Sequence, residues 1–312
     1  MERLLAMQLF VRVVETGTFA RAAASLRIPT SSATKLVQAL EGTLGVQLLE
    51  RTTRRVSVTA EGAAYYEHVR RMLEELDDVE AQLGHRTQSP KGLLRVDTGG
   101  SVAAQLLIPG LVAFRARYPL IHLQIGVTDR TVDLPSEGVD CAIRSTADDP
   151  LLITRKVAEL PWTLCAAPSY LAERGHPAGV EDLSRHDLVG YFSARSGRPA
   201  PLSLRTAAGH VERLDWTYAL EVNESNAHAA AARHGLGIVQ TLRFQVADEL
   251  ADGRLVEILP ALQPPPLPVY LVYPPSRRNN ARVRAFVEWI LDDLPRRAGV
   301  ERASVDGLPI LR

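Results

Sequence analysis

The stretch TFARAAASLRIPTSSATKLVQALEGTLG, residues 18–45, has the apolar spacing of two helices separated by a break at Pro29. Thr18 can cap the first helix, and the small alanines on the inward side of that helix allow another helix to approach closely. The second helix should end near Gly45, with a buried side at Ala33, Val37, Leu40 and Leu44. Two helices joined by a tight turn, the second presenting short polar side chains, are typical of a helix-turn-helix.

The segments on either side extend this prediction. Before the stretch, apolar residues at helical spacing predict a further helix that Gly17 ends. After it, LLERTTRRVSVT, residues 48–59, reads as two short strands around an arginine-rich tip. Residues 17–60 hold six bases and two acids, a formal charge of plus four, in a chain whose total charge is zero. A local basic footprint beside a polar helix indicates binding to duplex DNA.

The candidate DNA-binding residues lie on the outer side of the second helix and in the hairpin. They are Thr30, Ser31, Ser32, Thr34, Lys35, Gln38, Arg51, Arg54 and Arg55. The first three are also candidate helix caps, and the cations are expected to contact phosphates or a narrow minor groove. For each cation, a solvated surface position is the alternative interpretation.

From residue 61 to about residue 83 the sequence predicts one long helix. Its apolar positions recur every three or four residues and form a narrow seam: Tyr66, Val69, Leu73, Leu76, Val79 and Leu83. Because so thin a stripe cannot stabilise a helix alone, we expect it to pair with a second copy, or else to pack on the chain's own core. Residues 84–92 are expected to form a hinge.

Beyond residue 91 strands alternate with helices, which predicts a parallel α/β sheet. The pattern occurs twice, and the strand VYLVY, residues 269–273, is expected to return to the first repeat. Two lobes joined by crossing strands enclose a cleft, and such clefts bind ligands where strands end and helices begin. Free amides and the helix dipole favour an anion there.

Composition restricts the remaining possibilities. The chain has 312 residues with 23% charged, enough for two or three domains of a soluble protein. Two cysteines, Cys141 and Cys165, lie in apolar strand patterns and are expected to be buried rather than redox-active. His228 and His234 lie on opposite sides of one helix, so neither a metal nor a cofactor is expected. No signal peptide or membrane span is recognisable, and a cytoplasmic location is expected.

The run GTFARAAASLRIPTSSATKLVQALEGTLGVQLLERTTRRVSVTAEG, residues 17–62, resembles the DNA-binding domain of LysR-type transcriptional regulators. The resemblance continues to about Trp289 and is greatest to the subgroup of CrgA-type regulators. Many members open the third helix with Ser-Gln-Pro, where this chain has Pro29, Thr30 and Ser31. A glutamine can bond adenine in a bidentate manner, whereas Ser and Thr read several bases weakly, so the base preference of relatives cannot be transferred.

The resemblance implies an α/β protein with a winged helix-turn-helix, a long linker helix and a two-lobed, periplasmic-binding-protein-like (type 2) effector domain. The expected boundaries are residues 1–60 for DNA binding, 61–90 for the linker, 91–163 with 268–295 for lobe I, 164–267 for lobe II and 296–312 for a tail. The resemblance also implies a dimer through antiparallel linker helices, and assembly up to a homotetramer. Its candidate partners are double-stranded DNA, a small-molecule effector and RNA polymerase. No membrane association is expected.

The resemblance and the helix starts together nominate effector-binding residues. They are Gly100, Ser101, Thr128, Arg144, Ala167, Asn223 and Ser225. Ser101 and Thr128 match ligand-contacting positions of the family, and the glycine permits close approach. Ala167 can offer a backbone amide. Arg144 can hold a carboxylate or serve as a structural ion-pair partner, and the polar residues at helix starts can serve only as caps.

Two other functional classes compete with a ligand-controlled regulator. One is an enzyme that uses the cleft, but no nucleophile–base pair, metal set or phosphate loop has convincing spacing. The other is an architectural DNA-binding protein without an effector, which leaves the large cleft-forming part unexplained. We therefore expect a regulator and no enzyme.

Overall fold

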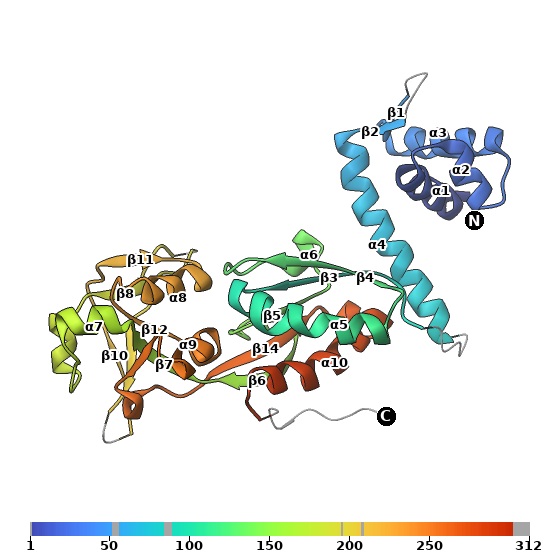
Figure 1. Ribbon diagram of the computed structural model, residues 1–312. Helices are drawn as coiled ribbons and strands as arrows, with labels where there is room; N and C mark the ends of the chain where they lie inside the picture. The colour runs from blue at the N-terminus through green and yellow to red at the C-terminus, as the bar shows by residue number, and fades with distance from the viewer. Residues whose placement is uncertain (1, 52–55, 84–88, 195, 207–208, 302–312) are drawn as a thin grey trace. The chain divides into compact units, whose positions relative to one another are not determined.

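The computed structural model describes residues 2–51, 56–83, 89–194, 196–206 and 209–301. The chain divides into two compact units, residues 1–88 and 89–312 (Figure 1). Among the described residues, none of the helices combines the length and apolar character needed to cross a membrane. Arg54 and Arg55, most of the predicted hinge and most of the predicted tail lie outside the described residues.

The first unit is a winged helix-turn-helix followed by a long helix. Its elements are α1 (Glu2–Thr16), α2 (Phe19–Ser25), α3 (Thr30–Leu44), β1 (Leu49–Arg51), β2 (Val56–Val58) and α4 (Ala60–Leu83). Thr18 caps α2 as predicted, accepting a hydrogen bond from the backbone N–H of Arg21. The predicted cap of α3 is wrong: Pro29 holds the cap position, and Thr30 is already the first helical residue.

The core of this unit forms between the first three helices. Phe10 and Leu9 of α1 are fully buried against the small residues Ala22 and Ala23 of α2 and against the inner side of α3. Ala33, Val37 and Leu40 are buried as predicted, whereas Leu44 is only partly covered. Burial of this apolar side fixes α3 with its polar side outward.

The N-terminal part of the long helix α4 packs against the core of the first unit. Val69 is buried in the core, with Tyr66 and Leu73 packed around it, and the rings of Phe10 and Tyr65 lie 5.7 Å apart. Leu76, further along, is 36% exposed. The predicted seam is therefore divided: its start packs on the chain's own core. The side chains of Val79 and Leu83 lie outside the described residues.

The second unit contains two lobes, each built on a five-stranded sheet. The sheet of lobe I has the order β4-β3-β5-β14-β6. The elements of lobe I are β3 (Gly92–Thr98), η1 (Val102–Leu107), α5 (Ile108–Arg117), β4 (Ile121–Val127), α6 (Leu134–Glu137), β5 (Cys141–Arg144), β6 (Ile153–Leu160), β14 (Leu267–Tyr273), η5 (Pro275–Arg277) and α10 (Ala281–Arg297). Phe114, Phe286 and Trp289 form its aromatic core, with ring centroids 5.0 to 5.7 Å apart.

Lobe II has the sheet order β11-β8-β12-β7-β13. Its elements are β7 (Trp162–Ala166), α7 (Pro168–Arg174), η2 (Glu181–Arg185), β8 (Leu188–Tyr191), β9 (Leu202–Arg205), β10 (Val211–Leu214), β11 (Leu220–Val222), α8 (Ser225–Arg233), β12 (Ile238–Leu242), η3 (Arg243–Val246), α9 (Ala247–Ala251), β13 (Val256–Ile258) and η4 (Pro260–Leu262). Separate apolar clusters that contain Leu164 and Val239 form its core.

The expected parallel sheets are in fact mixed. In lobe I, β3 runs parallel to β4 and β5, but β14 is antiparallel to both β5 and β6. In lobe II, β7 is antiparallel to β12 and β13. The reversed strands, β7 and β14, are those by which the chain enters each lobe from the other. The α/β class and the returning strand VYLVY are confirmed.

Candidate functional site

The outer side of α3 is the candidate nucleic-acid interface. Thr30, Ser31, Ser32, Lys35 and Gln38 are exposed on it. Thr34 is partly covered, and its hydroxyl donates to the carbonyl of Thr30 at 3.5 Å. Arg54 and Arg55 lie outside the described residues, and the same holds for the side chain of Arg51. The structure thus brings the six helical candidates to one open surface and leaves the three arginines as predictions.

The hairpin next to α3 is held at a fixed place by the helix itself. The carboxylate of Glu41, on α3, accepts hydrogen bonds from the backbone N–H groups of Leu48 at 2.9 Å and Leu49 at 3.1 Å. Strands β1 and β2 pair antiparallel, with Leu49 opposite Val58. Thr59 then donates to the carbonyl of Gln47 at 2.8 Å and caps the start of α4 by accepting from Gly62. Hydrogen bonds therefore join the described base of the hairpin to α3 and to the start of α4.

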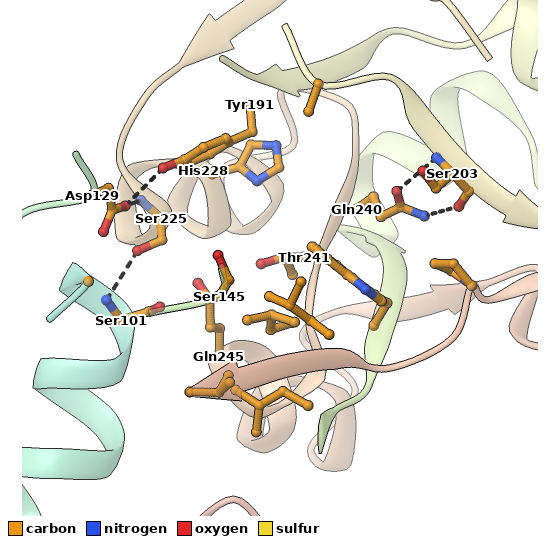
Figure 2. A pocket seen from close by; sticks show the side chains of 18 of the residues that line it. Ser101, Asp129, Ser145, Tyr191, Ser203, Ser225, His228, Gln240, Thr241 and Gln245 are labelled. Atoms are coloured by element: carbon orange, nitrogen blue, oxygen red, sulfur yellow. Dashed lines mark hydrogen bonds between the residues drawn. The ribbon is translucent and has the colours of Figure 1, made fainter. Parts of the chain in front are cut away.

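The second site is a cavity of about 780 Å³ between the two lobes of the second unit (Figure 2). Its walls include apolar and aromatic side chains from both lobes, such as Val102, Trp162 and Tyr218. Polar groups at Ser101, Thr241 and Gln245 lie among them. An apolar cavity with a few convergent polar groups is the usual form of a small-molecule site.

Four of the predicted effector residues line this cavity: Ser101, Thr128, Arg144 and Ser225. Ala167, Asn223 and Gly100 are not among the lining residues. Ala167 is 4% exposed and packs within the core of lobe II, because it is the residue at which β7 turns into α7. Asn223 is exposed, whereas Gly100 is buried where the two lobes meet.

The contacts of Arg144 indicate that it stabilises the fold of lobe I, in addition to any contact with a ligand. Its guanidinium donates to the backbone carbonyl of Val132, while its Nε has no hydrogen-bond partner among the described residues. Burial lowers the pKa of Arg144, and the neighbouring carboxylate of Asp97 opposes that change most strongly. Burial raises the pKa of Asp97 itself to about 6, although the charge of Arg144 counteracts the rise.

His228 is buried on α8 and faces the cavity. Its Nε2 lies 2.9 Å from the carbonyl oxygen of Val189, and its ring packs edge-on against Tyr191. Burial lowers the pKa of His228, so the ring is neutral near pH 7. With its Nε2 donating to that carbonyl, its Nδ1 is an acceptor. Sequence reasoning had treated this histidine only as a metal candidate.

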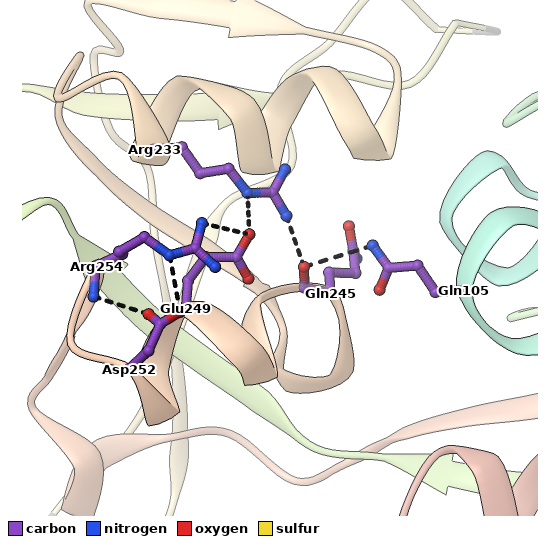
Figure 3. Close-up of polar contacts among 6 residues, drawn as sticks. All are labelled: Gln105, Arg233, Gln245, Glu249, Asp252 and Arg254. Carbon is purple, nitrogen blue, oxygen red and sulfur yellow. Dashed lines mark hydrogen bonds and ion pairs between the residues drawn. The ribbon is translucent and has the colours of Figure 1, made fainter.

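A polar cluster behind the cavity fixes the turn that follows β12 (Figure 3). Arg233 pairs with Glu249 at 2.6 Å and donates to the backbone carbonyl of Gln245 at 2.8 Å. Gln105, from lobe I, reaches the same carbonyl at 3.5 Å. The side-chain Oε1 of Gln245 has no hydrogen-bond partner among the described residues, which makes it an acceptor for a ligand.

Sequence reasoning missed Asp129, which lies where the two lobes meet. It follows the predicted Thr128 directly, and its carboxylate accepts hydrogen bonds from Gly100 of lobe I and from Ser225 of lobe II; Figure 2 shows the contact with Ser225. The sequence feature that could have indicated Asp129 was its position: an acidic residue at the carboxyl end of a predicted strand, in a cleft that also contains two predicted helix starts. Its partners in lobe II are 62 and 96 residues away in the sequence, so the sequence did not reveal that they meet.

Cys141 and Cys165 are buried, as predicted. Burial raises the pKa of Cys165 to about 12 and that of Cys141 well above its ordinary value, which keeps both thiols protonated. Within the described ranges, no group of three or more His, Cys, Asp or Glu side chains is arranged to hold a metal ion.

The fold and the two sites define a class of protein: a DNA-binding regulator with a separate ligand-binding unit. Comparisons agree with this class. Residues 4–63 match the bacterial regulatory helix-turn-helix protein family of lysR type, and residues 87–295 match the LysR substrate binding domain. The chain belongs to the LysR-type transcriptional regulators.

Individual relatives match along nearly the whole chain. An uncharacterised HTH-type transcriptional regulator from Escherichia coli, YhjC, is 37% identical, covering 98% of this chain and 100% of the relative. An HTH-type transcriptional repressor from Pseudomonas aeruginosa is 37% identical, covering 94% of this chain and 92% of the relative. The solved structure of CrgA, a LysR-type transcriptional regulator from Neisseria meningitidis, is 30% identical with a TM-score of 0.61, covering 93% of this chain and 98% of that one.

Proposed function

We propose that this LysR-type regulator binds specific operator DNA through α3 and that a small organic anion in the interlobe cavity controls the binding. The observation that supports DNA reading most strongly is the open polar side of α3, which Glu41 joins by two hydrogen bonds to the base of the hairpin. Its short hydroxyl side chains suit base edges and phosphates in a major groove. The proposal places the protein in the cytoplasm, where bacterial DNA lies.

A salt series tests the role of Lys35. Removing one phosphate contact should weaken binding and lower the slope of log affinity against log salt by about one. The Lys35→Ala variant should therefore lose affinity at low salt and have the smaller slope in fluorescence anisotropy with operator DNA. Arg12→Ala is the matched control, since Arg12 is an exposed cation on α1 that pairs with Glu15 at 2.9 Å. If the two variants had equal slopes of log affinity against log salt, Lys35 would not contact a phosphate of the DNA.

The anionic nature of the effector has support from two features of the cavity. Ser101 and Ser225 lie at helix starts of opposite lobes, where backbone dipoles favour negative charge. The partly buried Arg144 supplies a cation at the cavity wall. Apolar walls around these groups suit a compound with an apolar body and a carboxylate end.

A thermal-shift screen tests this assignment. A ligand that binds only the folded protein stabilises it by about 2.7 kcal/mol when present at a hundred times its Kd. Carboxylates should therefore raise the melting temperature of the second unit more than their neutral amides or alcohols. If every stabilising compound in a balanced panel were neutral, the effector would belong to another chemical class.

We also propose that the protein acts as a homodimer or homotetramer, with RNA polymerase as a further candidate partner. Exposed apolar side chains on α4, Met72 and Leu76, support a second copy along this helix. Sedimentation of the full chain should show a dimer or larger species at micromolar concentration. Ligand binding would then change the relative populations of assembly conformations that differ in their DNA contacts.

A further inference from the structure

The carboxylate of Asp129 lies between the starts of two helices that belong to different lobes. Its Oδ1 accepts from the backbone N–H of Gly100 at 2.7 Å, at the start of the lobe I helix. Its Oδ2 accepts from the backbone N–H of Ser225 at 2.7 Å, at the start of α8 in lobe II. The hydroxyl of Tyr191, also in lobe II, donates to Oδ2 at 3.2 Å. Figure 2 shows the contacts with Ser225 and Tyr191.

Three further N–H groups at these helix starts, those of Ser101, Asn226 and Ala227, also have partners within the protein. Ser101 donates its N–H to the hydroxyl of Ser225 at 3.1 Å, across the lobes. The carboxylate of Glu224 accepts from the N–H groups of Asn226 at 3.0 Å and Ala227 at 2.8 Å. These groups therefore already donate to the protein's own acceptors. An anion from solution cannot take the amides of Gly100 and Ser225 unless Asp129 leaves them.

The bonds of Asp129 also join the lobes on the side away from the crossing strands. Asp129 belongs to lobe I, since it follows β4, whereas Ser225 and Tyr191 belong to lobe II. The two lobes are connected covalently between β6 and β7 and between β13 and β14. The glycine at position 100 permits close contact, because a Cβ there would lie 2.4 Å from Glu224 Oε1.

The neighbouring cation does not hold Asp129 in place. Arg130 forms a two-pronged ion pair with Glu137, at 2.9 and 2.7 Å. Burial and the adjacent Asp129 carboxylate raise the pKa of Tyr191, which therefore remains a donor at neutral pH. Asp129 is thus held by neutral donors that could equally bind another carboxylate.

We propose that Asp129 is an intramolecular latch, which closes the two lobes by placing its own carboxylate where an effector anion would otherwise bind. The identification of the displacing anion as the effector rests on the proposed function; the latch itself does not. An incoming carboxylate must compete with Asp129 for the amides of Gly100 and Ser225, so the latch sets the concentration at which the protein responds. The closed arrangement is then available without ligand.

The test measures the distance between the lobes in the full chain. Spin labels on Ser136→Cys in lobe I and Thr217→Cys in lobe II report it by double electron–electron resonance. Both positions are exposed, and the two native cysteines are buried. The doubly labelled protein should give a short main distance that acetate does not change. Adding Asp129→Ala should give a longer or broader distribution, and acetate should restore the short distance while acetamide should not.

Two further variants keep the result interpretable. Asp148→Ala removes an exposed aspartate from the same lobe and should behave like the parent. Asp129→Asn keeps the size of the side chain and one acceptor oxygen, so it should open partly and resist rescue by acetate. An unchanged distance in both Asp129 variants, or opening in Asp129→Ala that acetate and acetamide affect equally, would overturn the latch. Because neither DNA nor effector enters this experiment, its failure is distinct from failure of the proposed function.

Discussion

At the residue scale, the turn of the helix-turn-helix contains a strained backbone position. Arg27 has a φ of 56°, in the left-handed region that glycine tolerates best. The conformation lets the N–H groups of Arg27 and Ile28 bond to the carbonyls of Ala24 and Ala23, which ends α2 and redirects the chain toward α3. An exposed arginine at this place adds positive charge beside α3 at a conformational cost.

Replacing Arg27 should separate the cost of this conformation from the loss of the side chain. Arg27→Gly relieves the strain in the folded protein, but it also increases the conformational entropy of the unfolded chain, which lowers stability. Arg27→Ala keeps the strain. We expect the glycine variant to be more stable than the alanine variant by about 0.5–1 kcal/mol. Urea unfolding monitored on the first unit measures the difference. Equal stabilities would mean that the strain at Arg27 is no larger than the free energy lost through the extra freedom of glycine in the unfolded chain.

Asp97 is a second residue whose environment has a measurable consequence. It is 6% exposed, and burial raises its pKa to about 6 from an ordinary value of 3.8. The folded protein therefore holds a proton on Asp97 more tightly than the unfolded chain does. As pH rises from about 4 to about 6, this group makes the folded state less stable, and the loss is complete above that range.

Asp97→Asn should abolish this loss. The variant should gain up to about 3 kcal/mol relative to the parent on going from pH 4 to pH 7.5, because its side chain never becomes charged. Thermal unfolding at the two pH values measures the gain. Asp148→Asn, at an exposed position of the same lobe, should show none. A parent and an Asp97→Asn variant with parallel pH profiles would rule out a raised pKa.

At the scale of elements, Glu41 makes α3 and the hairpin one unit. Its carboxylate accepts hydrogen bonds from the backbone N–H groups of Leu48 and Leu49. These two residues are 1% and 0% exposed, so water cannot replace Glu41 as the acceptor. Gly62 allows α4 to start against the same place, since a Cβ would lie 2.0 Å from the carbonyl oxygen of Leu48. Glu41 and Gly62 therefore both contribute to the position of the hairpin against α3 and α4.

Removing the carboxylate should weaken both stability and DNA binding. Glu41→Ala leaves two buried donors without an acceptor and should cost about 2–3 kcal/mol. Glu41→Gln keeps one acceptor oxygen and should cost less than half as much. Urea unfolding gives the stabilities, and anisotropy with operator DNA gives the affinities. Equal losses for alanine and glutamine would indicate that helix packing, and not the acceptor, positions the hairpin.

The success of sequence reasoning also differs between elements. The inward side of α3 and the cap of α2 were predictable because local spacing and a single threonine specify them. Strand β6 was missed, since its central residues Arg155 and Lys156 interrupt the apolar pattern. The antiparallel direction of β14 was also missed, because it depends on where the chain crosses between lobes. Likewise, the contacts of Asp129 arise only when distant segments meet.

At the scale of the whole molecule, one unit carries an exposed polar helix side and the other a cavity between its two lobes. The first needs exposed, rigidly held side chains, and the second needs buried polar groups that a ligand can engage. Regulation requires that a ligand distinguish between conformations of the second unit. An interlobe cavity that the protein's own contacts can close or release meets this requirement.

The most direct measurement is a nuclease footprint of the full chain on the DNA upstream of its own gene. It should be repeated over a salt series, and with the carboxylate that gives the largest thermal shift. We predict a long protected region with two spaced half-sites, lost steeply as salt rises and altered by the carboxylate. Uniform, weak coating at every salt concentration, unaffected by the carboxylate, would contradict a ligand-controlled, sequence-specific regulator.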